Sequence, residues 1–418
     1  MKFMKKLHKI GFSKLTSVKD AYNRLIESIE GNPSEEIPSK DCLNHVLASD
    51  VKSEMNIPPF DRSAMDGYAI LAEDSFGASP SNPKTVKKVG TSEIGEICTE
   101  KVKKGEAIRI STGAIVPEGA DAVIRIEETE IEEDVVTLLG SIPPGKNIAE
   151  KGEDVKEGEI ILKAGTQIKA EQLALISSLG IETIKVTVPP KIAIFATGNE
   201  LLEVGETYEG NKIYNSNTPM IVSLSKTYGA LIQNQGTLPD DKETLKKYIK
   251  ESSQTCQILV FTGGTSVGTK DFLPEVVEEL GQIQTHGIAM RPGSPILIGS
   301  YQKCLIFCLP GTPVAAYVGF LQFVGPAIRK MLNCTQLDPR RSIPATITDD
   351  VPLSGMGYIH FLRVIIKEVE NELHAIPYKL KGSGILTSLT EADGIVEISP
   401  IQEGLKRGEK VWVKLFPW

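Results

Sequence analysis

The chain has 418 residues, of which 41% are hydrophobic and 24% charged; this is typical of a globular protein and argues against a disordered chain, a collagen or a coiled coil. Its 46 Lys and Arg residues against 54 Asp and Glu residues leave a net charge of −8, whereas a nucleic-acid-binding protein is expected to be basic. The length predicts two to four domains, and 37 glycines and 25 prolines supply frequent turn signals.

Two features bear on where the protein is located. The six cysteines form no C-x-x-C pair, so we expect free buried thiols and a reduced, cytoplasmic environment. The basic residues 1–6 are not followed by an apolar stretch, which argues against a signal peptide.

One stretch is long enough to cross a bilayer. The 25 residues between Lys303 and Arg329 carry no charge. Pro310, Gly311 and Pro313 interrupt this run, and proline is well tolerated in the first turn of a helix. We therefore expect a buried strand, a turn and a buried helix, and no membrane span.

The first 190 residues predict a mixed start and a β-rich middle. Residues 16–30 have apolar residues at helical spacing and predict a helix that Thr16 could cap. Residues 55–150 hold short β-like runs between turn signals and no long helix. A helix over 166–179 and a strand over 183–188 follow, and Pro189-Pro190 indicates a boundary.

The pattern changes at Lys191. Apolar runs typical of strands covered on both faces alternate with helical patterns, which predicts a parallel, doubly wound α/β domain. The expected strands are 192–196, 231–235, 258–261 and 305–309, and the expected helices begin at Thr218, Lys242, Pro274 and Pro313. After residue 340 a small β domain or barrel is expected, with strands over 345–348, 358–366, 372–377, 395–398 and 410–415.

The first motif that could carry chemistry is Pro58–Tyr68. It places Asp61, Arg62 and Asp66 in a turn-rich segment. These charged groups could serve a site, but Asp residues also cap the turns of rigid loops, so the residues alone leave both interpretations open.

A glycine-rich loop over 261–271 follows an expected strand at its carboxyl end, where open α/β sheets bind ligands. Its glycines let backbone N–H groups approach an anion, and its hydroxyls add donors. Asp271 could hold a divalent ion that bridges phosphates. The candidate ligand-binding residues are Thr262, Gly263, Gly264, Thr265, Ser266 and Gly268.

This loop has two alternative interpretations. Its spacing matches neither a Walker P-loop nor the Rossmann fingerprint, so it could be a plain structural turn. Gly264–Gly268 also matches the nucleophile elbow of serine hydrolases. His360 and His374, however, fall in the β-rich tail, beyond the α/β domain, which argues against a hydrolase triad.

Three further segments end strands of the expected α/β domain. Glu200 follows the first strand and could bind a metal or a substrate, and Arg291 is a good phosphate ligand. The segment at 310–313 leads into a helix N-terminus, which favours anions. Individually, each segment is weak evidence for a site.

Together and in this order, the motifs resemble those of the molybdopterin molybdenumtransferase family, which includes bacterial MoeA and the E domain of gephyrin. The resemblance extends from about residue 16 to the C-terminus, and its most specific motif is P-P-F-D-x-S-x-M-D-G-Y-A at 58–69. Further matching segments are 112–117, 152–154, 197–201, 263–268 with Asp271, 309–311, 382–384 with Leu389, and 408–413.

The resemblance implies four domains and a homodimer. Domain I would comprise 31–54 and 155–189, and a β-rich domain II inserted in it would comprise 55–154. A central molybdopterin-binding α/β domain III would comprise 1–30 and 190–338, and a β-barrel-like domain IV would comprise 339–418.

The resemblance also implies a reaction. Adenylylated molybdopterin and molybdate would be the substrates, and Mg²⁺-dependent cleavage of the pyrophosphate linkage would yield molybdenum cofactor and AMP. Both substrates are anions, so clustered carboxylates at the site would need a bridging cation. A molybdopterin adenylyltransferase and the apo-proteins of molybdoenzymes would be partners.

Site residues follow from the family's motif positions. Those implied to be catalytic are Asp61, Thr112, Asp154, Glu200 and Asp271, and the metal ligands would be Glu200, Asp271 and Asp240 or Asp241. The substrate-binding set would be Arg62, Thr262, Gly263, Gly264, Thr265, Ser266, Gly268, Arg291, Ser294, Pro310, Gly311, Thr312, Pro313 and Ser383. Because Asp61, Thr112 and Asp154 lie outside the expected α/β domain, the implied site forms between domains, either in one subunit or across the dimer.

The chain departs from the family at two motifs. Where many relatives have Lys-Pro-Gly-Lys-Pro, residues 291–295 read Arg-Pro-Gly-Ser-Pro, which alters one cation and removes another at Ser294. Thr312 stands where relatives have Asn. These departures leave open a tungstate-specific paralogue or a non-catalytic molybdopterin carrier or scaffold. A molybdopterin adenylyltransferase fits less well, because such enzymes resemble the α/β domain only.

Overall fold

The structure is a computed structural model that describes residues 15–208, 210–264, 272–353, 356–378 and 382–417. These residues divide into two compact units. Unit 1 contains the chain up to Ser49, Ala164–Lys169 and the chain from Thr183 onward, and unit 2 contains Asp50–Lys163 and Ala170–Glu182. The predicted division into four domains stays a prediction.

A six-stranded sheet forms the centre of unit 1. Its strand order is β17-β14-β18-β22-β21-β19, with bounds Leu231–Leu238, Lys191–Thr197, Ile258–Thr262, Cys304–Leu309, Leu297–Tyr301 and Gln282–His286. The first four strands are parallel, which confirms the predicted α/β fold. β21 runs antiparallel to both of its neighbours, β22 and β19, so β19 has the same direction as the first four strands. Only two residues separate β21 from β22, and such a short connection forms a hairpin.

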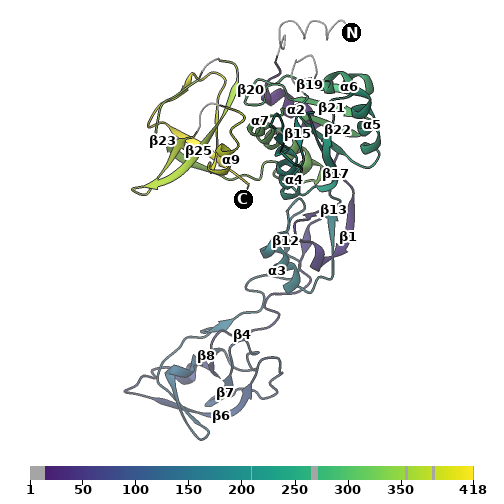
Figure 1. The fold of residues 1–418 in the computed structure, drawn as a ribbon. Helices are drawn as coiled ribbons and strands as arrows, with labels where there is room; N and C mark the ends of the chain where they lie inside the picture. Colours follow the sequence, from purple (N-terminus) through teal and green to yellow (C-terminus); the bar gives the residue numbers. More distant parts are fainter. Residues whose placement is uncertain (1–14, 209, 265–271, 354–355, 379–381, 418) are drawn as a thin grey trace. The chain divides into compact units, whose positions relative to one another are not determined.

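Helices cover both faces of this sheet, as the alternating pattern predicts (Figure 1). Along β14, Ile192 and Ile194 enter one core while Ala193 and Phe195 enter the other. The first core includes residues of α2 Val18–Glu27, α4 Asn217–Thr227, α7 Pro313–Gly319 and α8 Gly325–Met331, and the second those of α5 Lys242–Ser252 and α6 Leu273–Leu280. The cap of α2 is Ser17, whose hydroxyl accepts from the Asp20 N–H at 3.0 Å, so the predicted cap Thr16 is wrong by one residue.

The uncharged run folds as a buried strand, a turn and a buried helical segment, which confirms that prediction. The helical part is not one continuous α-helix, because the π-helical segment η4 Phe320–Val324 separates α7 from α8. Pro326 has no N–H to donate in the first turn of α8, and a wider turn before it accommodates that loss. Within the described residues, no helix is long and apolar enough to cross a membrane.

The C-terminal part of unit 1 is a closed β-barrel, as predicted. The strands β25, β26, β23, β29 and β27 follow one another, and β27 pairs back with β25. Their bounds are Ile359–Val369, Glu372–Pro377, Ser342–Ile347, Lys410–Leu415 and Gly394–Ile398, and α9 Thr387–Thr390 precedes β27. The short strand β20 Met290–Arg291 pairs with β25, which ties the segment around Arg291 to the barrel.

The remaining elements are mostly strands, which confirms the prediction that residues 55–150 are rich in β structure. In unit 1, β1 Ser34–Pro38, β13 Thr183–Thr187 and β2 Val46–Leu47 form a three-stranded sheet. Unit 2 contains the sheet β8-β5-β7-β6-β10-β9, with bounds Ala122–Arg125, Gly67–Ile70, Glu106–Ile110, Lys84–Ser92, Val135–Leu138 and Thr129–Glu132. It also holds the ladders β4 Arg62–Ser63 with β11 Ile148–Ala149 and β3 Val51–Lys52 with β12 Ile160–Leu162, and the helix α3 Ala170–Ser178.

Candidate active site

A cavity of about 700 Å³ lies in unit 1 at the carboxyl ends of β14, β18 and β22. This is the edge at which open parallel sheets bind ligands. Two of the predicted carboxylates and most of the predicted substrate-binding residues line it. They are Glu200, Asp240, Thr262, Gly263, Gly264, Arg291, Ser294, Pro310, Gly311, Thr312, Pro313 and Ser383.

Glycines let the three strand ends approach one another closely. Gly263 has φ +95°, and its N–H donates to the Leu309 carbonyl at 3.0 Å. A Cβ at Gly263 would lie 2.5 Å from the Thr197 carbonyl oxygen, and a Cβ at Gly311 would lie 3.5 Å from the Cα of Gly263. A side chain at Gly263 would therefore separate the loops, so glycine there is required by both conformation and space.

The carboxylate of Glu200 is placed by another glycine. A Cβ at Gly198 would lie 2.7 Å from both carboxylate oxygens of Glu200, so the absence of a side chain at Gly198 makes room for this group. The backbone of Glu200 is held as well, since its carbonyl accepts from the Ile213 N–H at 2.9 Å. The predicted carboxylate thus sits on a constrained turn directly after β14.

The structure distinguishes the two neighbouring aspartates. Asp240 lines the cavity. Asp241 caps α5, because its side chain accepts from the Thr244 N–H at 2.8 Å, and this hydrogen bond lowers the pKa of Asp241. Of the pair, Asp240 is the one placed where a bound ligand could reach it.

Three buried polar atoms in the cavity lining have no hydrogen-bond partner among the described residues. They are Thr197 Oγ1, Thr262 Oγ1 and Asn217 Oδ1, on side chains that are 4%, 1% and 8% exposed. Buried polar groups are normally satisfied, and an unsatisfied one costs about 1–3 kcal/mol. Three of them in one cavity indicate that a polar ligand completes it.

Asn217 was not predicted from the sequence. Its Nδ2 donates to the Gly311 carbonyl at 2.7 Å, which links the start of α4 to the loop after β22. Nearby, Asn215 Nδ2 donates to Thr218 Oγ1 at 2.9 Å and to Thr237 Oγ1 at 3.0 Å. The signal that could have found these residues is Asn-x-Asn-Thr-Pro at 215–219, two amides where a helix begins.

Another part of the lining comes from residues 291–295, which follow the pairing of β20 with the barrel strand β25, and from Ser383. The guanidinium of Arg291 lies 4.1 Å from the centre of the Tyr358 ring, a cation–π contact that orients it. The hydroxyl of Ser294 donates to the Met290 carbonyl at 2.6 Å. Ser383 reaches the cavity from the barrel side, and its carbonyl accepts from the Val314 N–H at 3.0 Å.

The other predicted residues, Asp61, Arg62, Thr112 and Asp154, belong to unit 2. Hydrogen bonds connect their segments: Asp61 Oδ1 accepts from the Lys151 N–H at 2.7 Å, and the Asp154 N–H donates to the Ile57 carbonyl at 3.0 Å. The Thr112 N–H donates to Asp66 Oδ1 at 2.8 Å, which lowers the pKa of Asp66. Asp61 and Asp66 therefore fix the loops around Thr112 and Asp154, as the structural interpretation of this motif predicts.

Four predicted residues, Thr265, Ser266, Gly268 and Asp271, lie outside the described part of the chain. Among the residues that are described, no three acids, histidines or cysteines are grouped closely enough to form a metal cage.

Three family models match the chain. The MoeA N-terminal region (domain I and II) matches residues 16–180, the "Probable molybdopterin binding domain" 193–330, and the MoeA C-terminal region (domain IV) 345–416. The molybdopterin molybdenumtransferase of Staphylococcus aureus (strain COL) is 33% identical over 395 residues, 94% of each chain. That of Staphylococcus epidermidis is 32% identical over 400 residues, 96% of this chain and 95% of the relative.

A solved structure is similar along nearly the whole chain. The molybdopterin biosynthesis moeA protein of Pyrococcus horikoshii OT3 superposes with a TM-score of 0.82 at 34% identity and covers 96% of this chain and 100% of that one.

Proposed function

Since this chain belongs to the MoeA family of molybdopterin molybdenumtransferases, enzymes of molybdenum cofactor biosynthesis, we propose that it inserts molybdate into adenylylated molybdopterin and releases AMP. The observation that most supports this is the trio of buried polar atoms at Thr197, Thr262 and Asn217 for which the described residues supply no hydrogen-bond partner. They line a cavity at the strand ends of the molybdopterin-binding fold. A ligand rich in polar groups, such as a pterin phosphate, would satisfy them.

The residues of the cavity suit anionic substrates. The backbone at Gly263 and Gly311 can approach a phosphate without interference from side chains. Arg291 supplies a guanidinium that is held by Tyr358. We infer that these groups bind and orient the pyrophosphate linkage while Thr262 and Asn217 contact other polar atoms of the substrate.

The two carboxylates in the cavity suit a magnesium ion. Mg²⁺ is usually held by one or two carboxylates together with substrate phosphates, without a cage made only of protein. Glu200 and Asp240, which both line the cavity, would hold it. The ion would offset the repulsion between carboxylates and phosphates and stabilise charge on the AMP leaving group. Without it, Glu200 and Asp240 would oppose binding of the substrates.

We further propose that Asp61, Arg62, Thr112 and Asp154 contribute to the same reaction and that the protein acts as a homodimer. The family resemblance at 58–69 and 152–154 is the support for their role. Free thiols, five of six of them buried, fit a reduced cytoplasm, where cofactor synthesis would supply molybdoenzyme apo-proteins.

A turnover assay separates this function from its alternatives. The purified protein is incubated with adenylylated molybdopterin, Mg²⁺, and either molybdate or tungstate. AMP release with formation of molybdenum cofactor supports the proposal, and a preference for tungstate identifies a paralogue with another metal. Tight pterin binding without AMP release would instead identify a carrier.

A further inference from the structure

A second large cavity in unit 1, here called the basic cavity, shares no lining residue with the proposed active site. Its volume is about 810 Å³. Its walls come from the end of α4, the connection that leads to β23 and the segment after β29, together with Asn44 and the stretch 167–169. Nothing in the proposed reaction uses these residues.

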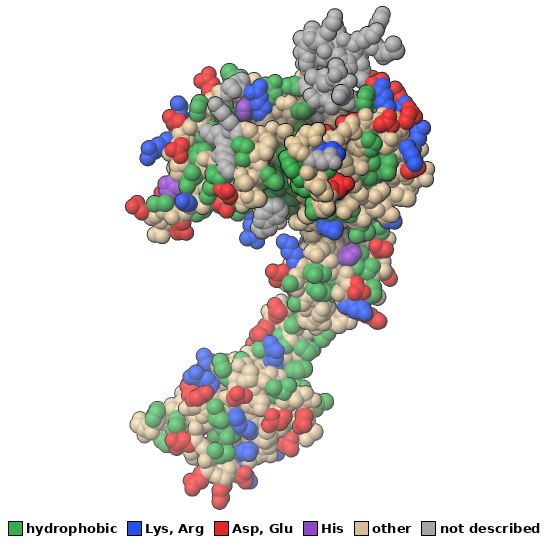
Figure 2. All heavy atoms as spheres, viewed as in Figure 1, with side chains coloured by type: hydrophobic (Ala, Val, Ile, Leu, Met, Phe, Trp, Pro, Cys, Tyr) green, Lys and Arg blue, Asp and Glu red, His purple; other side chains and the backbone are tan. Residues whose placement is uncertain are grey.

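All charged side chains among the described lining residues of this cavity are basic. Lys169, Lys226, Arg340 and Arg341 line it, and none of its described lining residues is acidic. This contrasts with the net charge of −8 of the whole chain and with the mixed charges on the face in Figure 2. Like charges gathered in one place repel, and a bound anion relieves that repulsion.

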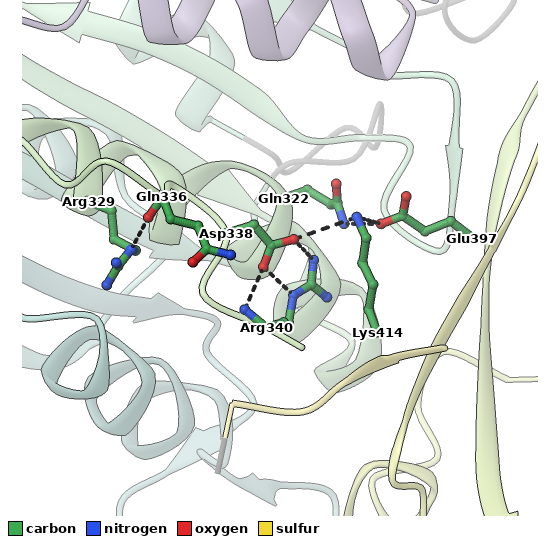
Figure 3. A network of polar contacts seen from close by, with 7 residues as sticks. All are labelled: Gln322, Arg329, Gln336, Asp338, Arg340, Glu397 and Lys414. Atoms are coloured by element: carbon green, nitrogen blue, oxygen red, sulfur yellow. Dashed lines mark hydrogen bonds and ion pairs between the residues drawn. The ribbon is translucent and has the colours of Figure 1, made fainter. Parts of the chain in front are cut away.

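Arg340 carries a buried donor that its ion pair leaves unused. Its Nε and Nη2 both donate to the carboxylate of Asp338 at 2.8 Å, within the network shown in Figure 3. Its Nη1 has no hydrogen-bond partner among the described residues, although Arg340 is only 6% exposed. A guanidinium is always charged and has five N–H donors, so this unfilled edge favours an acceptor with negative charge.

Tyr228 adds a second buried donor to the same lining. Its hydroxyl has no partner within the described part of the chain, and the residue is 1% exposed. Burial raises the pKa of Tyr228 to about 12, so the hydroxyl keeps its proton at neutral pH and can donate. The amides of Asn44 and Gln167 also belong to the lining.

We propose that the basic cavity binds a small anion that carries phosphate. A phosphate group accepts hydrogen bonds from several directions at once, which matches donors placed on separate segments of the chain. Guanidinium and ammonium groups, both present in this lining, commonly bind phosphate in proteins. Inorganic phosphate compounds and nucleotides both carry such a phosphate group. Comparing the affinity for one ligand of each kind shows which kind the basic cavity prefers.

The test is isothermal titration calorimetry of the full-length protein at constant ionic strength, with pyrophosphate and AMP as separate probes. The informative variant is Lys226→Gln/Arg341→Gln, because both side chains are exposed and neither is in the proposed catalytic machinery. Arg340→Gln is avoided because it would break the pair with Asp338. The control is Lys247→Gln/Lys250→Gln, which removes the same charge from exposed positions of α5.

We expect the cavity variant to weaken one binding event at least tenfold for one or both probes, whereas the control changes it less than twofold. The same event should persist in Arg291→Gln, which alters the active site, and the cavity variant should keep the wild-type rate of AMP release. If neither probe binds, or if the cavity variant and the control bind both probes alike, the basic cavity is not an anion site. A failure of the active-site proposal leaves this result unaffected.

Discussion

The carboxylate of Glu200 can occupy its position because Gly198 has no side chain. A Cβ at Gly198 would collide with this carboxylate. Gly198 also has φ +156°, a backbone conformation that residues with a side chain rarely adopt, so both space and conformation favour glycine here. The motif Thr197-Gly-Asn-Glu identifies both residues from the sequence, but only the structure shows why they occur together.

Gly198→Ala should therefore impair activity by displacing the carboxylate, and it should also lower the thermal stability because alanine is strained at φ +156°. The added Cβ would lie 2.7 Å from both oxygens of the Glu200 carboxylate and displace it from the cavity. We expect kcat to fall about 10–100-fold, since a small misplacement of a catalytic group is costly. Steady-state kinetics and thermal melting measure the two effects. The matched control is Gly236→Ala, at φ +158°, where a Cβ meets nothing within 4 Å: it carries similar backbone strain but should keep its activity. Equal activity of the two variants would contradict the placement of Glu200.

Glu200→Gln should lower kcat by about a hundredfold or more, because it removes a charge proposed to hold Mg²⁺ at the reacting phosphates. The matched control is Glu278→Gln, an exposed carboxylate on α6 that does not line the cavity. Activity is measured across a range of Mg²⁺ concentrations. Full activity of Glu200→Gln at every Mg²⁺ concentration would remove Glu200 from the metal site.

At the scale of helices and strands, the elements that could be predicted are those whose apolar residues form a continuous run or recur at helical spacing. The helix Lys242–Ser252 begins at its predicted residue, and the strands β18 and β22 lie within a residue of their predicted ranges, because continuous apolar runs and helical spacing are local signals. The π-helical segment Phe320–Val324 and the edge strand β19 were not predicted. Both depend on packing against neighbours, which no local pattern records.

The same distinction applies to the candidate site. Its glycines, Glu200 and Arg291 could be identified from motifs, and the structure brings them to one cavity. Asn217 could not, because its contact with the Gly311 carbonyl joins positions that are 94 residues apart. That Asp240 lines the cavity whereas Asp241 caps α5 likewise became visible only in the structure.

The connection between α8 and β23 contains a pH-sensitive ion pair. Burial alone would raise the pKa of Asp338, but the hydrogen bonds and charge of Arg340, together with Lys414, outweigh it and lower that pKa. A carboxyl whose folded pKa is depressed stabilises the fold above its unfolded pKa, about 3.9, and this contribution is lost as the pH falls through the folded pKa.

Asp338→Asn should therefore lower the free energy of unfolding at pH 7 by about 1.5–3 kcal/mol, because two hydrogen bonds to a charged group are weakened. The difference from wild type should shrink as the pH falls below about 4. Urea unfolding at pH 7 and at several acidic values measures it, with the exposed Asp134→Asn as the control. A difference that stays constant down to pH 2 would show that the Asp338 charge does not contribute.

At the scale of the whole molecule, the proposed site residues fall into two units of the chain. Glu200 and Arg291 belong to unit 1, whereas Asp61 and Asp154 belong to unit 2. If both sets serve one reaction in a homodimer, each set could act with residues of its own subunit or of the partner. Kinetics of mixed dimers can separate these arrangements.

Asp61→Asn and Glu200→Gln should each have little activity as homodimers. If the site is shared between subunits, verified heterodimers of the two variants should regain up to half of the wild-type activity, since one of two sites receives only unaltered residues. Activity is assayed after co-expression with two different affinity tags and tandem purification. Heterodimers as inactive as the parents would place both sets of residues in one subunit.

The most direct test of molybdate insertion is the ratio of AMP released to molybdenum cofactor formed in a single turnover. We expect one AMP per cofactor, dependent on both molybdate and Mg²⁺, and loss of both products in Glu200→Gln but not in Glu278→Gln. AMP release that continues at full rate without molybdate, or cofactor formation without AMP, would contradict the proposed reaction.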